Sequence, residues 1–190
     1  HVIGKDILKF HAIYWPAFLL ATGLGLPKKL LVHGHWKVSQ EKMSKSLGNV
    51  VDPNVEMDLF GVDGFRYLLL RIGRPDSDDD YDPLVMINKY NNELSNVFGN
   101  LLSRIRNPTF YPKLKLSTVD HPANRELVYK VTDAFDEYKF HWGLELIMKR
   151  LNDCNAYVNE MKPWTLAKEN QSDQLSNVMS SILSTILITT

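Results

Sequence analysis

The sequence predicts an α/β unit followed by an all-α unit, with the change near residue 80. Two short apolar runs flank a longer helical pattern within residues 1–35, an order typical of a parallel strand–helix–strand unit. From Pro83 onward, apolar residues recur at three- and four-residue steps, which is the period of a helix. The acidic segment Asp76–Asp82 separates the two patterns. We therefore expect one domain at 1–80 and a second at 81–190.

The first unit begins with two expected strands, His1–Ile3 and Leu30–Val32. The carboxyl ends of parallel strands meet at one edge of a sheet, and ligands bind at that edge in open α/β folds. We therefore expect Gly4–Asp6 and His33–Trp36 to lie beside one another and next to the loop at 42–46.

A helix is expected between these strands, with Asp6 as its N-cap and Gly23 as its end. The most apolar run of the chain, Phe10–Leu26, falls largely within it. That run contains His11 and Pro16 and is too short for a membrane span, so we expect a buried helix. No membrane partner is predicted.

Two further helices are expected before the change of pattern. Asp52 is a plausible N-cap, with Pro53 at the first helical position, and Asp63 opens the next helix. Asp76–Asp82 is expected to be a solvated hinge. A metal site at Asp78–Asp80 is disfavoured, because adjacent carboxylates repel one another without a defined cage.

The second unit is expected to be a helical bundle. A long helix should run from Pro83 to Ile105, followed by a loop at 108–121. The remaining helices are expected at 122–139, 142–161, 164–169 and 172–188.

Composition narrows the class of protein. The formal net charge of the 190 residues is zero, which argues against a bulk electrostatic nucleic-acid binder. Charge is uneven, however: residues 1–50 hold seven Lys/Arg against two Asp/Glu, and residues 101–150 hold nine against six. RNA contacts would therefore use local patches. Cys154 is the only cysteine, so neither a disulfide nor a cysteine zinc site is expected.

The segment Lys42-Met43-Ser44-Lys45-Ser46 is the most informative motif of the chain. Gly48 follows it, which is typical of a mobile loop. Lysine ammonium groups held on a loop can stabilise the charge that develops on a polyphosphate leaving group. A solvated turn is the alternative for a Lys/Ser loop in general.

The same five residues carry a resemblance to the class I aminoacyl-tRNA synthetases, and upstream residues narrow it. Gly4-Lys5-Asp6-Ile7, Phe10-His11, Tyr14–Ala17 and His33-Gly34 occur in the order and spacing of the methionyl-tRNA synthetases of the bacterial and organellar type. The resemblance implies the end of a Rossmann-like catalytic domain and an α-helical anticodon-binding domain. It also implies that the chain lacks an upstream part of the catalytic domain.

The resemblance further implies the reaction and its partners. Methionine and ATP, accompanied by Mg²⁺, would give methionyl-adenylate, and the methionyl group would then pass to tRNA(Met). A monomer in the mitochondrial matrix is expected, with a bacterial cytoplasm as the alternative compartment. No protein-bound metal is expected, since His33 and His35 lack a third patterned ligand.

Site residues are carried over position by position. The loop at residues 42–46, called the lysine loop below, would supply the catalytic residues Lys42 and Lys45. The ATP site would comprise Gly4, Asp6, His33, Trp36, Lys42, Ser44 and Lys45. Methionine would contact Phe10, His11 and Tyr14, and the tRNA anticodon would contact Asn100, Arg104 and Trp164.

The residue types suit these roles, although each has an ordinary structural alternative. Asp6 can accept hydrogen bonds from a ribose diol, or it can be a simple N-cap. An aromatic wall suits a thioether, but aromatic residues at helical spacing are more often core. Asn, Arg and Trp offer base-edge hydrogen bonds, a cationic plane and a stacking surface for loop bases, whereas Trp164 could equally be a core anchor.

Two other functions stay open at this point. The chain could belong to a class I synthetase for another amino acid. It could also be a non-catalytic relative that binds tRNA or another partner, although the intact lysine loop argues against this.

Overall fold

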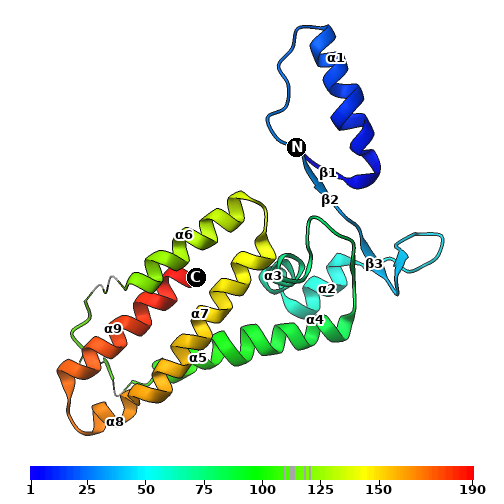
Figure 1. Cartoon of the computed structure of the whole chain (residues 1–190). Coiled ribbons are helices and arrows are strands. Elements are labelled where there is room, and N and C mark those ends of the chain that lie inside the picture. Colours follow the sequence, from blue (N-terminus) through cyan, green and yellow to red (C-terminus); the bar gives the residue numbers. More distant parts are fainter. Residues whose placement is uncertain (109, 112–113, 118, 120) are drawn as a thin grey trace. The chain divides into compact units, whose positions relative to one another are not determined.

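The computed structural model describes residues 1–108, 110–111, 114–117, 119 and 121–190. The chain forms two compact units, His1–Met86 and Ile87–Thr190 (Figure 1).

The first unit contains the predicted strand–helix–strand arrangement. Strands β1 (Val2–Gly4) and β2 (Leu31–His33) pair in parallel, and Gly4 is the register partner of His33. The connecting helical segment consists of η1 (Lys5–Ile7, a 3-10 turn), η2 (Phe10–Tyr14, a π-helical turn) and α1 (Trp15–Ala21). Gly23 follows with φ of 69°, the left-handed conformation that ends many helices.

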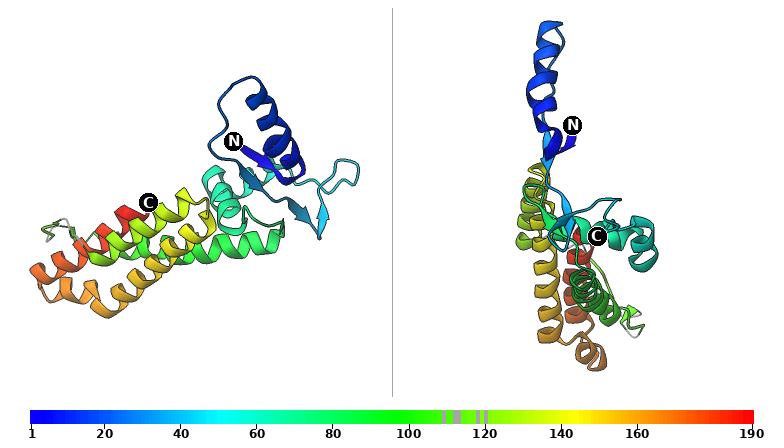
Figure 2. Two further views of the ribbon diagram at one scale, coloured as in Figure 1. Left: turned by 45° about the horizontal axis from the view of Figure 1, so that its top comes forward. Right: turned by 90° about the vertical axis from the view of Figure 1, so that its right-hand side faces the viewer.

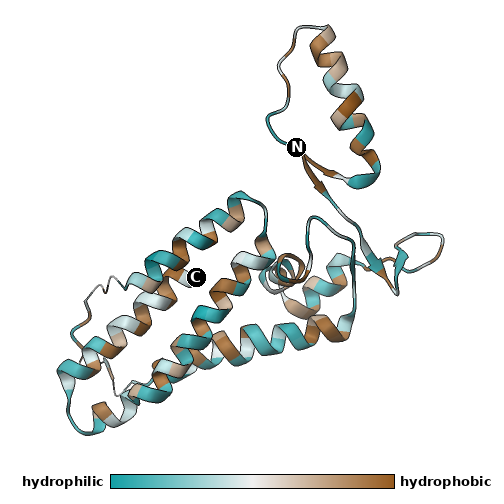
Figure 3. Cartoon of the chain, in the orientation of Figure 1, coloured by the Kyte–Doolittle hydropathy of each residue, from teal (hydrophilic) through white to brown (hydrophobic). Residues whose placement is uncertain are grey.

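Two expectations for this helix are wrong. Asp6 is not an N-cap: Gly4 holds that position, and the Asp6 carboxylate instead pairs with Lys42 and lies 3.1 Å from His35 Nε2. The helix is also not buried, and Phe18, for example, is 70% exposed. Figure 3 shows apolar residues along its length. A sheet of two strands, within the described residues, offers too little surface to cover a helix of this size.

A second small sheet follows in the order β4-β3-β5, from strands β3 (Trp36–Val38), β4 (Glu41–Lys42) and β5 (Asp79–Asp80). Ser39 and Gln40 join β3 to antiparallel β4 with φ of 53° and 66°, as in a type I′ hairpin turn. Strand β5 pairs in parallel with β3. The acidic segment is therefore not a solvated hinge, because its carboxylates meet donors on neighbouring segments.

Helices α2 (Pro53–Phe60) and α3 (Val62–Ile72) complete the first unit. Asp52 caps α2 as predicted and accepts the Asn54 N–H at 2.9 Å. Helix α3 begins after Gly61 rather than at Asp63, because Gly61 adopts φ of 72° and breaks the preceding helix.

One continuous helical segment covers the predicted range 83–105. It comprises α4 (Pro83–Lys89), η3 (Tyr90–Gly99, π-helical) and α5 (Asn100–Ile105), and the border between the two units falls within α4. The other helices are α6 (Pro122–Asp136), α7 (Phe140–Met161), α8 (Pro163–Lys168) and α9 (Ser172–Thr189). These elements confirm the predicted helices to within about three residues at each end.

The core of the second unit lies where α6, α7 and α9 run side by side (Figure 2). Its most buried side chains include Leu151, Val158, Leu175, Val178, Met179 and Ile182. In the part of the chain that the structure describes, no helix is long and apolar enough to cross a membrane.

Residues 115, 117 and 119 are fastened along α9 by three serine hydroxyl groups. The backbone N–H groups of residues 115, 117 and 119 donate to Ser176, Ser180 and Ser184 at 3.0, 3.1 and 3.3 Å. Four residues of α9 rise about 6 Å, a distance that two residues of chain between successive donors can span, so the two repeats match. This match explains serines at every fourth position of an otherwise apolar helix face.

Gly34 offers a test of the contact between residues 34–37 and 75–81. A Cβ atom there would lie 2.0 Å from the Ser77 carbonyl oxygen, and backbone cannot yield as a flexible side chain can. We expect Gly34→Ala to destabilise the first unit by about 2 kcal/mol or more, as overpacking does. Urea unfolding measures this. Gly25→Ala is the matched control, since no atom lies within 4 Å of its added Cβ, and equal losses in both variants would contradict the packing argument.

Candidate functional site

The carboxyl ends of β1 and β2 bring the first group of predicted residues together. A Cβ atom on Gly4 would lie 3.8 Å from the His35 ring and 3.9 Å from the His33 ring. The predicted neighbourhood of residues 4–6 and 33–36 is therefore confirmed. Gly4 has an ordinary φ of −73°, so neither strain nor crowding inside the chain requires a glycine at this position.

Asp6 joins this edge to the lysine loop. Its carboxylate forms an ion pair with the Lys42 ammonium group and lies 3.1 Å from His35 Nε2. The hydrogen bond from Lys42, and after it the nearby His35 imidazole, lowers the pKa of Asp6 below its ordinary value. Lys42 is placed by the hairpin β3–β4. It is the last residue of β4 and the register partner of Lys37 on β3.

The lysine loop is closed by Asn49. Its Oδ1 accepts the Ser44 N–H at 2.7 Å, and its Nδ2 donates to the Lys42 carbonyl at 3.4 Å. The Ser44 and Ser46 hydroxyls lie 2.8 Å apart. The Lys45 side chain is exposed, and no described carboxylate pairs with it. The loop thus presents one tethered ammonium group and one open to solvent.

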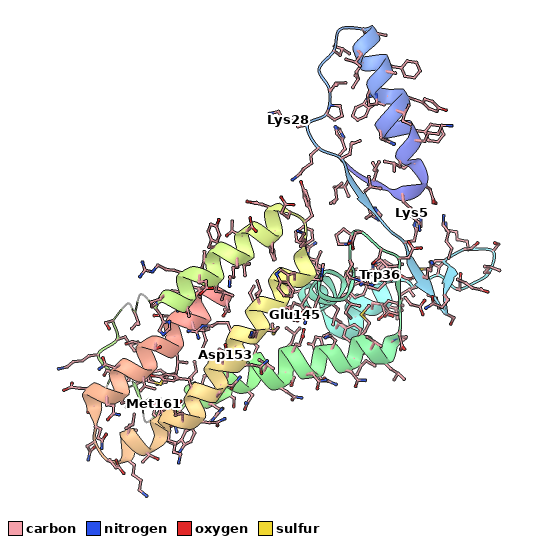
Figure 4. All side chains as sticks on the ribbon, viewed as in Figure 1. Lys5, Lys28, Trp36, Glu145, Asp153 and Met161 are labelled. Carbon is pink, nitrogen blue, oxygen red and sulfur yellow. The ribbon has the colours of Figure 1, made fainter. Side chains whose placement is uncertain are left out.

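His33 and Trp36 differ in what they offer a ligand. His33 is exposed at the end of β2, and its Nδ1 lies 2.8 Å from the Gly34 carbonyl oxygen. The Trp36 ring instead packs edge-on against Tyr81, with centroids 6.4 Å apart. Figure 4 labels Trp36 on this strand. The indole therefore belongs to the packing of the small sheet.

The aromatic residues of the first helix form two adjoining edge-to-face pairs. Phe10 and Tyr14 have centroids 5.8 Å apart, and His11 and Trp15 have centroids 6.1 Å apart. Phe10 is 57% exposed and Tyr14 41%, so these residues are not core in the first unit. His11 Nδ1 donates to the Ile7 carbonyl oxygen at 3.0 Å, which leaves Nε2 as an acceptor for a ligand.

The second unit brings the three predicted RNA-contacting residues into one cluster. The Arg104 guanidinium carbon lies 5.5 Å from the centre of the Trp164 ring. Asn100 Nδ2 donates to Asn155 Oδ1 at 3.4 Å, and Arg104 Nη1 donates to the Asn155 carbonyl oxygen at 3.4 Å. Trp164 is 42% exposed, so it is not a core anchor. The cluster combines a stacking surface, a cationic plane and amide groups.

Sequence reasoning missed several residues that hold these groups in place: His35, Asn49 and Asp78 in the first unit, and Asn155 and Asn159 in the second. Asn159 Oδ1 accepts a hydrogen bond from Arg104 Nη2, and Asn155 Nδ2 donates to the Val97 carbonyl at 2.9 Å. One signal was available, since the four-residue spacing of Asn155 and Asn159 on a largely apolar helix puts two amides on one face. No local pattern marks the others.

No group of three or more His, Cys, Asp or Glu side chains in the described ranges is arranged to hold a metal ion.

Comparison with known proteins decides the family. A family model described as class I tRNA synthetases (M) matches residues 1–106, more than half of the chain. The chain belongs to this family. Human mitochondrial methionine–tRNA ligase is 39% identical over 91% of this chain, and the Campylobacter jejuni methionine–tRNA ligase is 40% identical over all of it.

The class I synthetase assignment extends to solved structures and covers both units. Mycobacterium tuberculosis methionyl-tRNA synthetase in complex with methionyl-adenylate matches the whole chain with a TM-score of 0.85 and 33% identity, and the match covers 39% of that protein. The chain spans about a third of the length of the curated relatives, 33% of the human and 32% of the Campylobacter protein. Its relatives include both mitochondrial and bacterial enzymes.

The ion pair between Asp6 and Lys42 leads to a titration experiment. Because Lys42 is the main cause of the lowered pKa, the Asp6 side-chain carboxyl resonance should titrate below the ordinary value of about 3.9. Lys42→Met should bring the midpoint back up. Lys45→Met, which removes an ammonium group without a described partner, should leave it unchanged. Equal effects of the two substitutions would contradict the specific pairing.

Proposed function

We propose that this chain is part of a methionine–tRNA ligase. The enzyme would activate methionine with ATP to give methionyl-adenylate and pyrophosphate, and would then transfer the methionyl group to tRNA(Met). One observation carries the proposal: the Asp6–Lys42 ion pair brings the lysine loop to the strand edge formed by Gly4 and His33. Phosphate-binding cations and a ribose-binding carboxylate thus converge at the edge where α/β sheets bind nucleotides.

In the activation step, the methionine carboxylate attacks the α-phosphorus of ATP and pyrophosphate leaves. Lys42 and Lys45 would stabilise the charge that develops on the leaving phosphates, and Ser44 would donate a hydrogen bond to them. Asp6 would accept the ribose hydroxyls, with His33 and the backbone at Trp36 beside the adenine. Mg²⁺ would enter with ATP as part of the substrate, held mainly by phosphate oxygens and water.

The methionine side chain would lie against Phe10, His11 and Tyr14. Exposed aromatic faces suit a thioether, whose sulfur interacts favourably with ring edges. His11 Nε2 is the polar group in this wall, since Nδ1 is already bonded to the helix backbone. Trp15 would support the wall by its contacts with His11 and His1.

The helical unit would bind the anticodon of tRNA(Met) through Asn100, Arg104 and Trp164. Unpaired loop bases stack on aromatic and guanidinium planes and bond to amides through their edges. In this proposal residues 81–190 form the anticodon-binding domain, and residues 1–80 form the end of the Rossmann-like catalytic domain with its lysine-loop subdomain. The enzyme would act as a monomer, in the mitochondrial matrix or, as the alternative, in a bacterial cytoplasm.

Amino-acid-dependent exchange of pyrophosphate with ATP separates this proposal from its alternatives. Methionine-dependent exchange by the full-length protein supports it, exchange driven by another amino acid favours a different class I synthetase, and tRNA binding without exchange favours a non-catalytic relative.

Lys45 should contribute mainly to catalysis. Lys45→Ala in the full-length protein should slow adenylate formation by roughly 100-fold or more, as loss of a cation at developing charge does. Single-turnover kinetics measure the rate, and the dissociation constant of methionine should change little. An unchanged rate would exclude the assigned role.

Trp164 should contribute to tRNA recognition alone. Trp164→Ala should weaken tRNA binding by about 1–3 kcal/mol, the usual worth of one stacked base, and raise the KM for tRNA. Adenylate formation, which needs no tRNA, should stay near normal. If instead the melting temperature falls while anticodon preference is kept, Trp164 has a packing role and the RNA assignment is wrong.

A further inference from the structure

Asp78 lies just before β5, and its carboxylate contacts two lysines and one backbone N–H group. Its two carboxylate oxygens accept hydrogen bonds from Lys5 Nζ at 2.7 and 2.8 Å, and Lys37 Nζ lies 2.9 Å from Oδ2. The backbone N–H of His35 donates to Oδ1 at 2.9 Å. The side chain of Asp78 is only 19% exposed. One carboxylate thus joins three segments: the turn after β1, where Figure 4 labels Lys5, the start of β3 and the start of β5.

The two lysines that Asp78 binds are neighbours of the Asp6–Lys42 pair. Lys5 precedes Asp6 in the chain, and Lys37 is the direct cross-strand partner of Lys42. Directly opposed like charges destabilise a strand pair. By pairing with Lys5 and Lys37, Asp78 leaves the Asp6 carboxylate to Lys42 and His35.

His35 connects the two carboxylates. Its backbone N–H binds Asp78, while its Nε2 lies 3.1 Å from Asp6 Oδ1. Fixing the backbone at His35 therefore also fixes where the imidazole meets Asp6. The pKa of Asp78 is held far below its ordinary value, chiefly by Lys5, so it carries its full charge at neutral pH.

We propose that Asp78 is a positioning residue of the adenylation site. It pairs with Lys5 and Lys37, so that the Asp6 carboxylate pairs with Lys42 of the lysine loop. The inference rests on the proposed function, because adenylate formation is the activity it would tune. Asp78 touches no reacting atom in this scheme. It acts through Lys5, Lys37 and the backbone of His35.

Asp78→Asn in the full-length protein tests the proposal. The amide keeps the size of the side chain and an acceptor for His35 N–H, but it loses the charge that holds two lysines. We expect kcat/KM for ATP in methionine-dependent pyrophosphate exchange to fall about 10-fold or more, as misplacement of catalytic groups does. The KM for methionine should stay near normal. Asp79→Asn is the matched control, since Asp79 binds Arg74 instead, and should leave the ATP kinetics unchanged.

A double variant separates charge partition from simple loss of packing. Lys37→Met removes one competing cation, so Asp78→Asn/Lys37→Met should recover most of the ATP kinetics lost in Asp78→Asn. No recovery, or equal kinetics in Asp78→Asn and Asp79→Asn, would overturn the proposal. If Asp78→Asn does not fold, the double variant decides in its place: near-normal ATP kinetics support the proposal, and a 10-fold loss contradicts it.

Limited trypsin digestion gives a readout that is independent of activity. Cleavage after Lys42 should be faster in Asp78→Asn than in Asp79→Asn, because Lys5 and Lys37 would then displace Lys42 from Asp6. Unchanged cleavage would exclude the positioning role even if the unsubstituted protein lacks methionine-dependent exchange. A lack of methionine-dependent exchange in the unsubstituted protein would instead overturn the proposed function, whatever the digestion shows.

Discussion

The ion pair between Asp6 and Lys42 is the interaction on which the arrangement of the candidate catalytic site depends. It joins the turn after β1 to the hairpin β3–β4, and among the described residues no backbone hydrogen bond links these two segments directly. Both side chains are more than half exposed, and exposed ion pairs contribute little to stability. Its effect is therefore geometric: it holds a loop of mainly polar residues near the edge where β1 and β2 end.

Charge balance explains why the acidic segment before α4 is ordered. The backbone N–H of Gln40 bonds to Asp80, and Arg74 bonds to Asp79, so successive carboxylates point to different donors. Together with Asp78, they fasten β5 to β3 although aspartate is disfavoured in strands. Gly34 permits the close approach of the two backbones, since any Cβ there would collide with the Ser77 carbonyl group.

The sequence predicted the elements whose signal is periodic and the positions whose signal is a motif. The helices of the second unit and the parallel strands fall in this group, whereas Asn100, Arg104 and Trp164 were named together only through the family resemblance. The hairpin at Ser39–Gln40 and strand β5 were missed, because strands of two or three residues carry no period and neither turn residue is glycine. Asp78 and Asn49 were missed as partners because nothing local marks a contact that depends on tertiary register.

In each candidate site a cationic side chain, Lys42 or Arg104, is held by a contact that a ligand can replace. The groups that hold the two side chains differ in charge. Lys42 pairs with a carboxylate, and in the proposed function ATP would supply ribose hydroxyls to Asp6 and phosphates to Lys42 together. Neither charge would then be left without a partner. An unpaired charge is what makes breaking an ion pair costly. Arg104 rests on asparagine oxygens and an indole face, and no described carboxylate pairs with it. In the proposed function its charge therefore stays available to RNA, whose neutral bases bring no anionic group comparable to a triphosphate. A carboxylate beside Arg104 would neutralise the guanidinium group and repel the phosphate backbone of RNA. Amides fix the orientation of the guanidinium group without either effect.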